Sequence, residues 1–183
     1  ELAQREAYGK RYDVGAREAE QARAIAAGGA TTDTQMLNEL LGLEYKGLFT
    51  DTALTILIGK SSIESKRLLA AARGALNEGL KVVKAGKTLG DIGDSIQSYV
   101  SKKGFSVIRG LGGHGVGYGV HEDPFIPNWG NRGTGITLRE GMMLAIEPMV
   151  TSGSGEVVQK QDGSFATADG MPAAHFEHTV AIT

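Results

Sequence analysis

Two histidines lie in a glycine-rich segment that runs from Gly113 to Pro124. His114 and His121 are seven residues apart, and glycines alternate with other residues between them. A backbone with glycine at these positions can approach a neighbouring strand or a ligand closely. The pair alone leaves two interpretations open: both histidines could carry chemistry, or His114 could be a hydrogen-bonded core histidine and His121 a surface histidine.

Three acidic residues lie in runs that are otherwise apolar. Asp51 lies in a β-branched stretch, Glu147 ends an apolar run directly before a proline, and Glu177 lies in an aromatic and β-branched run. A carboxylate is costly to bury unless it is paired or bound to a cation. Each acid alone would also suit a solvated edge strand. Three such acids together with His114 indicate one shared cation site.

A site of three carboxylates and one imidazole is rich in oxygen donors. Such a donor set favours Mn, Fe or Co over a purely tetrahedral Zn arrangement, while Zn remains an option. A divalent ion activates water and polarises a carbonyl oxygen, so metal-assisted hydrolysis is the reaction class that fits. Two other classes are disfavoured: no Gly-x-Ser-x-Gly turn precedes a helix, and Gly113–Gly119 opens no helix, as a dinucleotide-binding loop would.

The composition limits the expected partners and compartment. The 183 residues carry 19 Lys and Arg against 21 Asp and Glu, so no basic surface for nucleic acid is expected. The absence of cysteine excludes a disulfide framework and a thiolate metal site, and fits a reducing compartment. No apolar run reaches the roughly 20 residues of a membrane span, and the opening segment is charged, unlike a signal peptide. We expect one soluble, cytoplasmic domain without a membrane partner.

The elements that must position these residues begin with helices. Residues 1–30 are alanine-rich and charged, which favours one or two surface helices. Thr31–Asp33 would cap a further short helix over residues 34–41. The β-branched run Leu48–Ile58, which carries Asp51, predicts a buried strand.

Two consecutive amphipathic helices follow that strand. The first has capping-box spacing at Ser61–Glu64 and apolar residues at helical intervals up to Gly86, and the second runs from Thr88 to Gly104. The remainder predicts strands and glycine-rich turns, with strands over Phe105–Arg109, Met142–Met149, Glu156–Lys160 and Ala173–Thr183. In the last of these, alternation places His175, Glu177 and Thr179 on one face. This order predicts an α+β fold with helices on one face of a largely antiparallel sheet.

Seven blocks, in this order, resemble the metal-binding half of the type I methionine aminopeptidases, which have the pita-bread fold and belong to peptidase family M24. The blocks are Gly47–Thr52, Gly113–Gly117, Val120–Pro124, Ile126–Gly130, Leu138–Met142, Ala145–Met149 and Phe176–Thr179. The resemblance covers residues 42–183 and implies a pita-bread-like curved antiparallel sheet. Residues 1–41 do not share it and are set apart as a divergent helical segment of the same domain. Ile146–Met149 and Glu177–Thr179 favour the methionine aminopeptidases over the prolidase and creatinase branches.

The resemblance implies a role for each of these residues. Asp51 and Glu177 would bridge two metal ions, and His114 and Glu147 would ligate one of them. His121 would contact the scissile peptide and stabilise its tetrahedral intermediate, and Glu147 would also carry a proton.

The implied reaction is removal of the N-terminal methionine from a peptide or a nascent protein. Within the same resemblance, Phe176 and Trp129 correspond to positions near the substrate pocket.

One departure from the family concerns the second ion. In the family, an aspartate eleven residues before Asp51 chelates the other ion, and here that position is Leu40. Glu39 would face the opposite side of a strand and Asn38 would lie one pleat away, so neither replaces it. We therefore expect one tightly held divalent ion, Co, Mn, Fe or Zn.

A second departure is the missing first half of the family fold. That half supplies another active-site histidine, whereas residues 1–41 contain none. One hypothesis is an aminopeptidase, weakened or completed by a second copy in a homodimer. The other is a catalytically inactive or engineered module that keeps the metal site and serves a binding or structural role.

Overall fold

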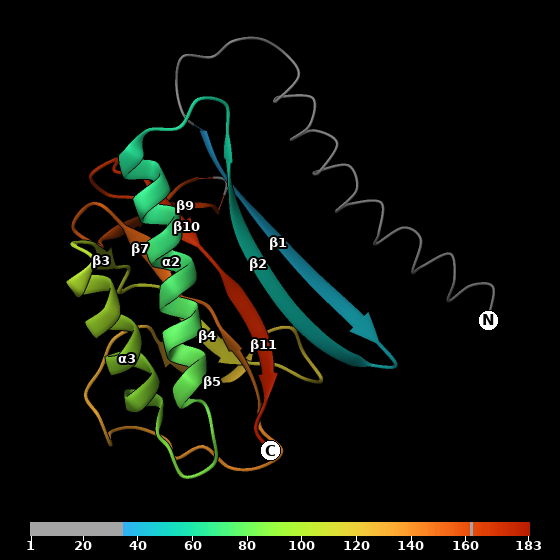
Figure 1. The fold of residues 1–183 in the computed structure, drawn as a ribbon. Coiled ribbons are helices and arrows are strands. Elements are labelled where there is room, and N and C mark those ends of the chain that lie inside the picture. Colours follow the sequence, from blue (N-terminus) through green and yellow to red (C-terminus); the bar gives the residue numbers. More distant parts are fainter. Residues whose placement is uncertain (1–34, 162) are drawn as a thin grey trace, which may run out of the picture.

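Two long helices lie against one face of a curved antiparallel sheet (Figure 1). The structure is a computed structural model and describes residues 35–161 and 163–183. The main sheet has six strands in the order β1-β2-β11-β6-β4-β5, and all of its pairings are antiparallel. Their bounds are β1 Gln35–Tyr45, β2 Leu48–Ile58, β11 Glu177–Ala181, β6 Met143–Ile146, β4 Gly112–Gly115 and β5 Glu122–Pro127. The predicted α+β class is confirmed.

Both amphipathic helices are present where the periodicity predicts them. Helix α2 spans Ile63–Val82, and its cap is Ser62, whose hydroxyl accepts a hydrogen bond from the backbone N–H of Ser65. Helix α3 spans Leu89–Lys102 and begins with a reciprocal capping box between Thr88 and Asp91. Capping satisfies backbone N–H groups that have no partner within a helix, so these boundaries follow from local chemistry.

The hydrophobic core lies between these helices and the sheet. Ile92 and Ile96 of α3 are completely buried, as is Ile146 of β6. A Cβ atom added to Gly79 of α2 would lie 3.6 Å from Ile146, so helix and sheet are in close contact there. Neither α2, α3 nor any other helix of the described residues has the length and apolar character to span a membrane.

Two predicted continuous strands are wrong, because each is split between two sheets. A second sheet has the order β10-β7-β3, with β10 Ala173–His175, β7 Met149–Thr151 and β3 Ser106–Val107. The predicted strand Met142–Met149 breaks into β6 and β7 at Glu147 and Pro148, since proline has no N–H for the ladder. The predicted strand Ala173–Thr183 breaks into β10 and β11 at Phe176, which turns into the core. The remaining strands, β8 Val157–Gln159 and β9 Phe165–Thr167, form a separate hairpin.

The predicted short helix over residues 34–41 is also wrong, because β1 begins at Gln35. Its eleven residues pair continuously with β2. The connection is Lys46–Gly47, where both residues have positive φ (53° and 81°), as in the two-residue turns that match the twist of a hairpin. Long-range pairing outweighs the local capping signal here. The predicted helices of residues 1–30 lie outside the described residues, and the division at residue 41, which falls within β1, stays a prediction.

Candidate metal centre

Threonine hydroxyls tie the strand that carries Asp51 to the end of the chain. The Thr179 hydroxyl accepts from the backbone N–H of Asp51 at 2.8 Å and donates to its carbonyl oxygen at 2.7 Å. The Thr52 hydroxyl donates to the carbonyl oxygen of Glu177 at 2.8 Å. The ladder between β2 and β11 pairs only two residues of each strand, so these side chains add restraints where the ladder is short. They fix Asp51 and Glu177 side by side.

His114 is held between two closely packed strands. It lies on β4 opposite Ala145 of β6, and a Cβ atom on either neighbouring glycine would overlap a backbone oxygen of an adjacent strand. Its Nδ1 lies 2.9 Å from the carbonyl oxygen of Gly115. Because a carbonyl oxygen only accepts, Nδ1 carries the proton and the lone pair of Nε2 is free to bind a cation.

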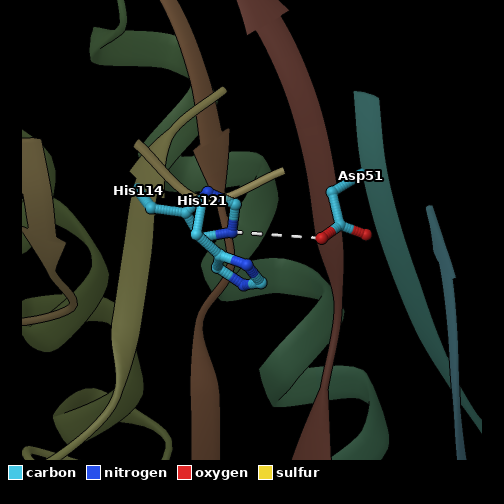
Figure 2. Close-up of side chains that lie close together, drawn as sticks. All are labelled: Asp51, His114 and His121. Carbon is cyan, nitrogen blue, oxygen red and sulfur yellow. Dashed lines mark ion pairs between the residues drawn. The ribbon is translucent and has the colours of Figure 1, made fainter. Parts of the chain in front are cut away.

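The three acids converge on this Nε2 atom. It lies 3.6 Å from Glu147 Oε1, 3.9 Å from Glu177 Oε1 and 4.0 Å from Asp51 Oδ2. Figure 2 shows the last of these pairs, with Asp51 projecting from β2 toward the imidazole of His114. Donors bound to one ion at about 2.0–2.2 Å lie roughly 3 to 4 Å apart, so the spacing suits a shared ion. All four residues are more than nine-tenths buried.

The burial of Glu177 supports a bound cation independently of the distances between the side chains. Both of its carboxylate oxygens are buried and have no hydrogen-bond partner among the described residues. Burial, with the nearby carboxylates of Glu147 and Asp51, raises the pKa of Glu177 to about 8. Burial also raises the pKa of Asp51, although the N–H of Thr52 donates to it at 2.9 Å and works in the opposite direction. A buried cluster of acids, of which Glu177 has no hydrogen-bond partner among the described residues, fits a divalent cation, which would favour the charged form of each.

The cluster opens into a cavity of about 840 Å³. His121 is exposed at its wall, with its ring centroid 4.2 Å from that of His114, and Figure 2 shows the two imidazoles close together. The lining joins the acidic cluster to apolar walls and consists of Asp51, Gly110–His114, His121–Asp123, Phe125, Glu147, Met149, Phe165, His175 and Glu177. The five residues predicted for metal binding and catalysis are all brought together here.

The two predicted substrate contacts lie elsewhere. Phe176 packs in the core, with the guanidinium of Arg73 of α2 5.3 Å from its ring centre. The Trp129 ring stacks with Arg109, also at 5.3 Å, and neither aromatic residue lines the cavity. Phe125 and Phe165 line it instead, and no sequence signal marked them. Substrate contact by Phe176 or Trp129 stays a prediction.

His175 is a site residue to which the sequence analysis gave no role. Its Nε2 lies 3.1 Å from Glu147 Oε2, and the side chain lines the cavity. The signal was present in the alternation that put His175 on the face of Glu177. Its pairing with Glu147 was not visible, because the two belong to segments 28 residues apart.

The register of β1 shows where Leu40, the position of the missing aspartate, lies in the sheet. Leu40 pairs with Ala53, and Gly42 lies directly opposite Asp51. Among the described residues, the groups that could hold an ion are Asp51 with His114 and His121, and His114 with Glu147 and Glu177. A single ion stays the prediction for this site.

The sequence is similar to known proteins over most of its length. The model of metallopeptidase family M24 matches residues 7–183. Methionine aminopeptidase 1 of Bacillus subtilis is 43% identical over 152 residues, which are 82% of this chain and 61% of that protein. The methionine aminopeptidase of Aquifex aeolicus is 45% identical over 147 residues, 78% of this chain and 56% of that protein. The chain thus spans about 60% of the length of these relatives.

The fold is similar to solved structures as well. The crystal structure of methionine aminopeptidase from Thermotoga maritima superposes with a TM-score of 0.78 at 47% identity, covering 81% of this chain and 60% of that one. A prolidase from Pyrococcus furiosus gives a TM-score of 0.63 at 22% identity, which shows the fold alone. The predicted pita-bread-like architecture is confirmed.

Proposed function

Since the chain belongs to metallopeptidase family M24, we propose that it is a metal-dependent aminopeptidase that removes N-terminal methionine from peptides or nascent proteins. The resemblance predicted from the motifs is thereby confirmed at the level of the family and its methionine aminopeptidase relatives. One observation carries the proposal: three buried acids surround the Nε2 atom of His114 at the end of a cavity, and one of them has no hydrogen-bond partner among the described residues.

Different residues of the site would carry out different parts of the proposed reaction. Asp51, His114, Glu147 and Glu177 would hold one divalent ion, with Mn, Co, Fe or Zn as the choices that suit the donors. When bound, such an ion supplies a Lewis acid that activates water and polarises the peptide carbonyl. His121, exposed beside His114, would donate to the scissile peptide, and Glu147 would move the proton to the leaving amine.

The cavity suits an apolar side chain at the end of a peptide. Its volume of about 840 Å³ exceeds that of one residue, and Leu111, Phe125, Met149 and Phe165 form apolar walls near the acids. An acidic cluster beside apolar walls fits a positively charged N-terminus that bears an apolar side chain. A cytoplasmic location stays a prediction from the composition.

A second copy of the chain is proposed as a partner. The outer hairpin face is defined as the side of β1 and β2 opposite Asp51. Six apolar residues on this face are each 37–60% exposed: Leu41, Leu43, Tyr45, Leu48, Leu54 and Ile56. Figure 1 shows this hairpin extending beyond the helices, with β1 as the outermost strand of the described sheet. An exposed apolar face beside a strand that has one neighbour among the described residues favours association, and the same surface on two copies gives a closed dimer.

The alternative is a module that binds metal without turnover. The leucine at position 40 favours it. Titrating Mn²⁺ or Co²⁺ into metal-free protein by calorimetry, while assaying a Met-Ala-Ser peptide, separates the two. Binding with release of methionine supports the aminopeptidase, and binding without release supports the inert module.

The matched variants are Glu177→Ala in the cluster and Glu140→Ala, an exposed acid outside it. We expect Glu177→Ala to weaken ion binding more than about 100-fold, because removing a ligand exceeds the usual effect of changing an outer partner. Glu140→Ala should behave as the wild type. No saturable ion binding by the wild type would overturn the proposal.

A further inference from the structure

The two oxygens of Glu147 face different imidazoles. Oε1 lies 3.6 Å from Nε2 of His114, and Oε2 lies 3.1 Å from Nε2 of His175. We propose that His175 is a positioning residue that holds Glu147 Oε2, so that Oε1 stays directed at the ion. The inference rests on the proposed function, because it assigns Glu147 to an ion.

His175 is itself held firmly. Its backbone N–H donates to the Thr55 hydroxyl at 2.7 Å, and that hydroxyl donates back to the carbonyl oxygen of His175 at 2.9 Å. Thr55 is 1% exposed, so both hydrogen bonds are protected from water. The pairing of β10 with β7 puts His175 opposite Met149, two residues beyond Glu147. Two independent restraints therefore fix the backbone of His175, from which the imidazole reaches the carboxylate.

The side chain of Glu147 has freedom that its backbone lacks. The side-chain amide of Asn128, which is 1% exposed, donates to the carbonyl oxygen of Glu147 at 3.0 Å, and a proline follows. Changing His175 would leave that backbone in place and release only the carboxylate. An effect of such a change on ion binding would then report the orientation of the carboxylate.

The 3.1 Å separation is within hydrogen-bonding range, but the imidazole N–H is not yet well aligned on the oxygen. The buried Nε2 has no other hydrogen-bond partner among the described residues. A ligating carboxylate whose second oxygen is hydrogen-bonded binds its ion more tightly, and losing such an outer partner costs about 10–100-fold in affinity.

The test compares side chains that do and do not donate at the same reach. The Mn²⁺ dissociation constant of His175→Gln, whose terminal amide substitutes for Nε2, should stay within about threefold of the wild type. His175→Leu and His175→Asn, which remove or shorten the donor, should bind Mn²⁺ about 10–100-fold more weakly by calorimetry. His178→Leu, an exposed histidine on β11, is the matched control and should leave binding unchanged.

Each outcome decides something different. Wild-type affinity in His175→Leu or His175→Asn would overturn the positioning role while leaving the proposed function standing. Equal losses in His175→Gln and His175→Leu would also overturn it, since a donor at the same reach would then restore nothing. A wild type that binds no Mn²⁺ would overturn the proposed function itself. His175→Asn keeps a polar side chain, so the comparison with His175→Gln holds even if His175→Leu does not fold.

Discussion

Strands β2 and β6 belong to one sheet but bury opposite kinds of side chain. β6 buries Leu144, Ala145 and Ile146, which are all apolar. β2 does the reverse, burying Asp51 and Thr55 and leaving Leu54, on the outer hairpin face, 47% exposed.

The difference shows that burial follows the cluster of acids on β2 and hydrophobicity on β6. On β2, Asp51 and Thr55 are buried, and threonine hydroxyls form hydrogen bonds with the backbone beside them. The apolar groups on its other face are exposed.

The same truncation on the two strands should have unequal costs. Ile146→Ala removes a fully buried side chain and should lower the free energy of unfolding by about 2–5 kcal/mol. Ile56→Ala removes a side chain that is 39% exposed and should cost less than about 1 kcal/mol. Urea denaturation at low protein concentration measures both. Equal losses would mean that the outer hairpin face is covered within one chain.

The acids should make the metal-free protein less stable as pH rises. The folded chain holds a proton on Glu177 up to about pH 8, whereas the unfolded chain releases it near 4.5. Between these values the folded state binds more protons, so stability falls with rising pH, by about 1.4 kcal/mol per unit for one such group. Between pH 5.5 and 7 the expected loss is about 2 kcal/mol.

Chemical denaturation in EDTA at several pH values measures this slope. Glu177→Gln removes the titrating group and should flatten it. Adding Mn²⁺ should reverse the trend, because the ion binds the charged carboxylates that form as pH rises. A metal-free wild type whose stability rises over this interval would contradict the raised pKa of Glu177.

The threonine bridge between β2 and β11 should have a smaller effect. Thr179→Val removes the hydroxyl that both accepts from and donates to the backbone of Asp51. Two buried backbone groups lose a partner, which should cost about 1–3 kcal/mol and weaken ion binding through Asp51. Thr50→Val, on the exposed face of β2, is the control for denaturation and calorimetry. Identical behaviour of the two variants would show that the Thr179 hydroxyl neither stabilises the fold nor supports ion binding.

The smallest effect on folding is expected at the outer hairpin face itself. Leu54→Lys should change the unfolding free energy of the monomer by less than about 0.5 kcal/mol, because the site is exposed. In light scattering over a range of concentrations, the wild type should form dimers and the variant should dissociate at least about tenfold more readily. Ile63→Lys, an exposed apolar residue on α2, is the control. A monomeric wild type at all concentrations would exclude the dimer.

The sequence by itself predicted the parts of this molecule that depend on neighbouring residues. Helices α2 and α3 follow from caps and apolar spacing. The β-branched run predicted the span of β2, but the prediction that this strand is buried is wrong for its outer face. The chemistry was also predictable, since Asp51, Glu147 and Glu177 are acids in apolar runs that need a cation. The motifs identified the family over residues 42–183.

Only the tertiary structure decided what depends on residues far apart in the chain. Residues 35–41 form a strand because β2 pairs with them, although the residues before them give a helix-capping signal. The chain changes sheets at Pro148 and Phe176, and that crossing brings His175 to Glu147. The exposure of Leu54 and Ile56 depends on which elements cover them. Propensity and capping are local, whereas strand pairing, sheet crossing and burial are set by contacts between distant segments, which spacing along one chain does not record.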